Sequence, residues 1–135
     1  MQSEMERFLG RFAPHFFAIL RIVAGLMFAM HGTQKLFGWP GDKPPRTDMT
    51  SLIGGAIELG AGLLIAAGLF ASWAAFLACG TMAVAYWWKH GWGASPWPIV
   101  NRGELAVLYC FLWLFLAAHG PGVWSLGRKR DRAPL

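Results

Sequence analysis

From residue 59 to residue 88 the sequence reads LGAGLLIAAGLFASWAAFLACGTMAVAYWW, thirty residues without Asp, Glu, Lys, Arg or His. A single helix of that length would span roughly 45 Å, whereas the hydrocarbon core of a bilayer is about 30 Å thick. The segment Gly-Leu-Phe-Ala-Ser at residues 68–72 interrupts the stretch with a turn-forming glycine. The stretch therefore predicts a tight hairpin between two membrane-spanning helices.

The composition of the whole chain also indicates a membrane protein. Of its 135 residues, 56% are hydrophobic and 14% are charged, and the mean hydropathy is +0.41. A soluble domain with this composition could not cover its apolar surface. The length suits one domain, so we expect residues 1–135 to form a single transmembrane domain.

Four apolar windows, each close to the ~20 residues that a transmembrane helix requires, lie at residues 14–37, 52–70, 72–88 and 104–120. Pro14 suits the first turn of a helix, and Gly120-Pro121-Gly122 ends the last one. The connections between the windows are short, which favours antiparallel neighbours. We expect an all-α fold, an integral membrane four-helix bundle with both termini on one side.

Basic residues indicate the orientation of this bundle. On the terminal side lie Arg7, Arg11, Arg128, Lys129, Arg130 and Arg132, against Lys35, Lys43, Arg46, Lys89 and Arg102 on the other side. The positive-inside rule then favours cytoplasmic termini in a bacterial inner membrane. The net charge of +5 comes largely from the C-terminal cluster, which topology explains better than nucleic acid binding does.

Polar residues inside the windows are candidate functional residues, because an ionisable group in hydrocarbon is unfavourable unless it has a partner. His31, Gln34 and Lys35 share one helix face, and Glu58 lies between Gly54 and Gly62 in the next window. His31 and Glu58 both fall about 9 Å inside the outer boundary at ~1.5 Å per residue. We expect Glu58 to contact His31 or Lys35, either as a packing lock or as a proton-handling or headgroup-binding site.

Further polar and aromatic residues fall on the same outer side. Asn101 suits an N-cap of the last helix and Glu104 its first turn, while Trp88 suits interfacial anchoring or a ligand surface. The candidate ligand site comprises His31, Gln34, Lys35, Glu58, Trp88, Asn101 and Glu104, and includes no metal. We expect Arg21 to snorkel toward the terminal side.

Cys79 and Cys110 both lie in the middle of apolar windows. They do not form the C-x-x-C pair that is typical of thiol oxidoreductases. We interpret both as small buried hydrophobic residues.

Several motifs together resemble the DoxX family of four-helix bacterial membrane proteins. They are HGTQKLFG at residues 31–38, GAIELGAGLL at residues 55–64, NRGELA at residues 101–106 and GPG at residues 120–122. The resemblance extends from about residue 19 to residue 126. It implies the membrane fold, and it implies a relation to a subunit associated with thiosulfate:quinone oxidoreductase.

The residues and the resemblance leave three functions open. The first is an accessory or anchoring subunit of a redox-linked complex that binds a quinone or a lipid headgroup at the outer helix ends. The alternatives are a small-solute transporter-like protein and a purely structural assembly protein. The sequence contains no C-x-x-C, haem attachment or dinucleotide fingerprint, and we therefore assign no catalytic residue or enzyme class. Expected partners are the lipid bilayer and either other proteins or further copies of the chain, not nucleic acid.

Overall fold

A computed structural model describes residues 1–91 and 95–127, which are helical and contain no strand. In chain order the elements are α1 (Glu4–Gly10), α2 (Ala13–Phe37), α3 (Met49–Ala67), α4 (Ala71–Tyr86), a π-helical turn η1 (Trp87–Gly91), α5 (Pro98–Asn101) and α6 (Glu104–His119). The four expected windows correspond to α2, α3, α4 with η1, and α6. The short helices α1 and α5 were not expected. By length and composition α2 and α3 could each cross a membrane, and α6 is a shorter apolar helix.

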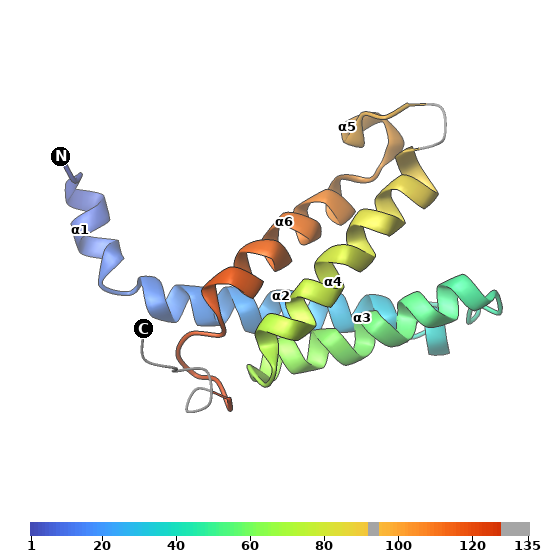
Figure 1. Cartoon of the computed structure of the whole chain (residues 1–135), viewed down its shortest axis with the longest axis horizontal. Helices are drawn as coiled ribbons and strands as arrows, with labels where there is room; N and C mark the ends of the chain where they lie inside the picture. The colour runs from blue at the N-terminus through green and yellow to red at the C-terminus, as the bar shows by residue number, and fades with distance from the viewer. Residues whose placement is uncertain (92–94, 128–135) are drawn as a thin grey trace.

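Helices α2 and α3 run antiparallel and in close contact (Figure 1). Glycines spaced seven residues apart make this contact possible. A Cβ atom built on Gly62 would lie 2.6 Å from the backbone oxygen of Gly25, and one on Gly32 would lie 2.5 Å from the backbone oxygen of Gly55. No side chain fits at such distances, so the two backbones approach each other directly, as at other helix contacts built on small residues.

The hairpin expected at residues 68–72 is present between α3 and α4. Gly68 adopts a left-handed conformation (φ 70°), and the amide of Leu69 donates to the carbonyl of Leu64 at 3.0 Å. This pattern closes the helix C-terminus as a Schellman motif does. Phe70 is also left-handed (φ 49°), and α4 begins at the next residue.

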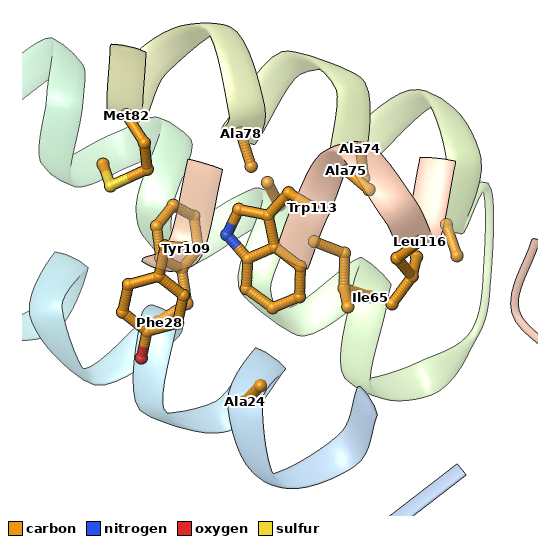
Figure 2. Packing of buried hydrophobic residues seen from close by; sticks show 12 residues of the cluster. Ala24, Phe28, Ile65, Ala74, Ala75, Ala78, Met82, Tyr109, Trp113 and Leu116 are labelled. Atoms are coloured by element: carbon orange, nitrogen blue, oxygen red, sulfur yellow. The ribbon is translucent and has the colours of Figure 1, made fainter. Parts of the chain in front are cut away.

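The core lies where α4 and α6 meet α2 and α3. Trp113 of α6 is fully buried and packs against Phe28 and Tyr109, with ring centroids 5.4 and 5.5 Å away (Figure 2). The side of α4 that faces it carries alanines, among them Ala75 and Ala78, both 0% exposed. These small side chains leave room for the indole, so complementary size and not polarity decides this contact.

Arg21 fixes the segment that follows α6. Its guanidinium donates to the carbonyls of Pro121, Val123 (2.9 Å) and Trp124 (2.7 Å), and its side chain is 0% exposed. The expectation that Arg21 snorkels into water is therefore wrong, because three backbone oxygens replace water around its charge. The segment is also attached to the end of α3, where the amide of Leu126 donates to the carbonyl of Ala67 at 3.1 Å.

Toward the end that carries α5, α4 and α6 diverge from α2 and α3 (Figure 1). The arrangement is more open than the compact bundle we expected. The segment after α6 and the start of α2 lie together at the opposite end. The basic cluster at residues 128–132 lies outside the described residues.

Candidate functional site

An ion pair between α2 and α3 forms the centre of the candidate site. Lys35 Nζ lies 2.6 Å from Glu58 Oε1, which confirms the expected contact. Each Cα–Cβ bond tilts toward the N-terminus of its own helix. In antiparallel helices this directs Lys35 inward from the end of α2 and Glu58 outward from the middle of α3, so the two side chains converge.

Glu58 lies deeper than the sequence suggested. Helix α3 begins at Met49, three residues before the expected window, and Glu58 follows Met49 by nine residues, or about 14 Å. Its residue exposure is 3%, whereas the Lys35 side chain is 26% exposed. The pair therefore joins a buried carboxylate to an ammonium that reaches toward the surface.

The second oxygen of this carboxylate has no partner in the part of the chain that the structure describes. Among the described residues, Glu58 Oε2 is buried and accepts no hydrogen bond. A buried carboxylate oxygen without a donor costs free energy, and it can accept a hydrogen bond from a ligand that reaches it. This half-satisfied carboxylate is the chemical feature that sets the site apart from a simple packing contact.

A groove of about 740 Å³ between α3 and α4 leads to Glu58. Its walls are mainly apolar and aromatic and include Ile57, Trp73, Phe76, Leu77, Val84 and Trp88. Its charged groups are Lys35, Glu58 and Lys89. Gly54 of α3 and Gly80 of α4 also line it, and a Cβ on Gly80 would meet nothing within 4 Å. A long apolar groove with a few charged groups suits an amphipathic ligand.

Two of the residues expected at this site lie elsewhere. The ring of His31 meets Tyr109 of α6 edge-on, with centroids 6.1 Å apart, so His31 is not the partner of Glu58. Gln34 donates to the carbonyl of Pro40 at 2.9 Å and holds the loop after α2. His31, Gln34 and Lys35 share a helix face but not a partner. The side of α2 that carries them contacts α6, the following loop and α3 in turn.

Asn101 organises a separate junction and does not cap α6. The N-cap of α6 is Gly103, and Asn101 is the last residue of α5. Its amide donates to Tyr86 Oη and to the carbonyl of Ser95, each at 3.1 Å, while its oxygen accepts from the amide of Gly103 at 2.8 Å. The expected N-cap role is therefore wrong, since the chain makes a further turn before α6 begins.

Glu104 is exposed at the start of α6, and it does not line the groove. Trp88 does line the groove and is 70% exposed. Of the seven expected site residues, the structure thus brings together Lys35, Glu58 and Trp88. The α4 side of the groove was missed, and the only sequence signal for it was the spacing of Trp73, Gly80 and Trp88 in an apolar helix.

A second cavity of about 820 Å³ lies at the opposite end, between the start of α2, the start of α4 and the end of α6. His119 is the ionisable residue that lines it, and its ring lies 4.2 Å from that of Phe17. Among the described residues that line this cavity, none is a buried carboxylate. Within residues 1–91 and 95–127, no group of three His, Cys, Asp or Glu residues could hold a metal ion.

Comparison with known proteins gives two matches. A sequence model of the DoxX family matches residues 16–91, a region that contains all but the first three residues of α2, all of α3 and α4, and both members of the ion pair. An uncharacterized protein of Haemophilus influenzae is 39% identical over 127 residues, which cover 90% of this chain and 95% of the relative. No solved structure matches the chain.

Proposed function

The chain belongs to the DoxX family, and from that premise we propose that it is a multi-pass protein of the bacterial inner membrane whose α3–α4 groove binds an amphipathic molecule. The ligand class is a quinone in its quinol form or a phospholipid headgroup. In this role the chain acts as an accessory or anchoring subunit of a redox-linked complex. The observation that carries the proposal is the buried Glu58 carboxylate, with one free oxygen, at the groove.

The outward faces of the long helices support placement in a bilayer. On α2, the side chains of Ile19, Leu20, Val23 and Leu26 are each 47–49% exposed, and on α6 Leu108 and Phe111 are 68% and 65% exposed. Contiguous apolar surface of this kind marks contact with a membrane or a partner. In a bilayer, lipid would cover these faces and remove the free-energy cost of exposing them to water.

Four crossings fit the positions of the chain ends, and the short helix α6 would cross where the bilayer is locally thinner than about 30 Å. Helix α4 has 16 residues and continues for 5 more in η1, while α6 has 16 residues, or about 24 Å. An even number of crossings puts the start of α2 and the end of α6 on one side. The excess of Lys and Arg on that side favours the cytoplasm.

The groove suits a ligand with a polar headgroup and an apolar tail. An ionised carboxylate can only accept hydrogen bonds. A ligand of Glu58 Oε2 must therefore supply the donor, such as a quinol hydroxyl or a headgroup ammonium. Lys35 and Lys89 offer positive charge to a carbonyl or phosphate oxygen. The apolar wall formed by Phe76, Leu77 and Val84 would lie along an isoprenoid or acyl chain.

The test begins with protein purified from native membranes in mild detergent, followed by identification of bound lipids, quinones and proteins by mass spectrometry. Purified protein is then titrated with decylubiquinol and with phosphatidylethanolamine, with Trp fluorescence as the readout. Phosphatidylcholine is the control lipid, because its headgroup has no N–H donor. Binding of one of the two donor ligands, without binding of phosphatidylcholine, is the expected result.

Glu58→Gln tests the role of the carboxylate in this titration. The amide keeps the shape but replaces the free acceptor with a donor, so affinity is expected to fall roughly 10- to 100-fold, as for a lost hydrogen bond to a charged group. Glu104→Gln makes the same change at an exposed carboxylate outside the groove and should bind as the wild type does. Equal affinities for Glu58→Gln and the wild type would instead favour a purely structural ion pair.

A further inference from the structure

The two cysteines of the chain meet across the interface between α4 and α6. Cys79 Sγ lies 3.6 Å from Cys110 Sγ, although 31 residues separate them in the sequence. Each lies near the middle of its helix, and each thiol is free. We propose that Cys79 and Cys110 form a redox pair that closes to an interhelical disulfide when a lipid-soluble quinone oxidises it.

The geometry permits this bond with little movement. A disulfide needs its sulfur atoms about 2.05 Å apart, so the gap must shorten by about 1.5 Å. The two helices are held close because α4 presents small, fully buried residues, including Ala75 and Ala78, toward α6. The thiols already contact each other through an S–H···S interaction.

The surroundings decide which oxidant can reach the pair. Neither α4 nor the middle of α6 carries a charged residue, and both cysteines pack against the hydrophobic core while each keeps part of its surface exposed. With α4 and α6 in a bilayer, as in the proposed function, that exposed part faces hydrocarbon. Water-soluble disulfides such as oxidised glutathione would be excluded, whereas a quinone dissolved in the bilayer has access.

The reaction balances without any other reactant. The two S–H bonds break and one S–S bond forms, so the cysteines lose two electrons and two protons. The quinone takes up both electrons and both protons and becomes a quinol. Each disulfide formed therefore yields one quinol, and the product ties α4 covalently to α6.

This site differs from the α3–α4 groove. Cys79 is not among the α4 residues that line the groove, which include Phe76, Gly80 and Val84. The inference rests on the membrane placement in the proposed function, and although both invoke quinone chemistry, they use different residues. The Cys79→Ala/Cys110→Ala variant is therefore expected to bind groove ligand as the wild type does, so that failure of one proposal can be distinguished from failure of the other.

The experiment uses the full-length protein, reduced and then freed of reductant, in lipid nanodiscs under anaerobic conditions. Decylubiquinone is the oxidant, because its ring has no free position at which a thiol could add. After denaturation, free thiols are alkylated and the intact mass is measured, while quinol is followed by absorbance. We expect both cysteines to be protected from alkylation, the protein to lose two hydrogen atoms, and quinol to appear in a one-to-one ratio.

Cys79→Ser and Cys110→Ser are matched controls, each of which removes one partner with little change in side-chain size. Neither should produce quinol or an intramolecular disulfide. Alkylation of both wild-type cysteines after exposure to the quinone would overturn the inference. Equal quinol yields from the wild type and the single variants would also overturn it, because the electrons would then come from elsewhere.

Discussion

Two buried charges in this protein have different kinds of partner. At the end where α2 begins and α6 ends, Arg21 is fully buried. Its two terminal guanidinium nitrogens donate to three backbone carbonyls of the segment after α6, while its Nε has no partner among the described residues. Between α2 and α3, Glu58 is nearly as buried, but one of its oxygens pairs with Lys35 and the other has no partner among the described residues. A charge that backbone groups solvate holds a fold together, whereas a half-satisfied charge beside a groove is available to a ligand.

Packing is tight around Arg21 and open around Glu58. Around Arg21, a Cβ on Gly68 would lie 2.3 Å from Ser125, so the C-terminal segment fits closely against the α3–α4 turn. Around Glu58, Gly54 and Gly80 leave the space between α3 and α4 open. We therefore expect mutations near Arg21 to affect mainly stability and mutations near Glu58 to affect mainly binding.

Arg21→Met should have the largest effect on stability. It leaves the carbonyls of Pro121, Val123 and Trp124 without their donor, and each buried acceptor that loses its donor costs about 1–3 kcal/mol. Thermal unfolding in detergent would measure the loss. Arg21→Lys keeps the charge but not the forked geometry of the guanidinium. Its unfolding temperature should lie between those of the wild type and Arg21→Met. A wild-type unfolding temperature for Arg21→Met would show that the C-terminal segment is held by other contacts.

Lys35→Met comes next and tests the ion pair. It leaves the Glu58 carboxylate buried without its cation, which we expect to cost about 1–3 kcal/mol, less than a fully enclosed pair because Lys35 is partly exposed. The double variant Lys35→Met/Glu58→Leu removes both charges and should recover part of this loss. The two side chains do not interact energetically if the loss of stability in the double variant equals the sum of the losses in Lys35→Met and Glu58→Leu.

A matched pair of glycine substitutions tests the close contact of α2 with α3. Gly62→Ala places a Cβ 2.6 Å from the backbone of α2, so the helices must separate, at a cost of about 1–3 kcal/mol. Gly60→Ala, two residues earlier in α3, meets nothing within 4 Å and should stabilise the helix by up to about 1 kcal/mol. Chemical denaturation of both variants would measure the difference, and effects of the same sign would argue against direct backbone contact.

Asp48→Ala should have the smallest effect and a specific pH dependence. Asp48 caps α3, and hydrogen bonds from the Ser51 side chain and backbone amide hold the pKa of the carboxyl below its usual value. A lowered folded-state pKa means that the cap stabilises the protein above the unfolded pKa. That stabilisation is lost as the pH falls through the folded-state pKa. The difference in unfolding temperature between wild type and variant should therefore vanish in acid, and a pH-independent difference would contradict this assignment.

The sequence by itself determined the number and approximate ends of the long helices. Hydrophobic windows at residues 14–37, 52–70, 72–88 and 104–120 correspond to α2, α3, α4 with η1, and α6. The hairpin at residues 68–72 was also predicted. These features depend on local properties, namely the length of apolar runs and the turn preference of glycine, which a single segment carries without reference to any other. The contact of Glu58 with α2 followed from the same reasoning, because a buried carboxylate requires a partner.

Only the tertiary structure decided which groups meet. It selected Lys35 over His31 for Glu58, surrounded Arg21 with carbonyls, and brought Cys79 to Cys110. It also opened the groove between α3 and α4. Each of these depends on the register and separation of helices, which close glycine contacts and the fit of Trp113 against alanines determine. Because those contacts join distant segments, no local pattern in the sequence specifies them.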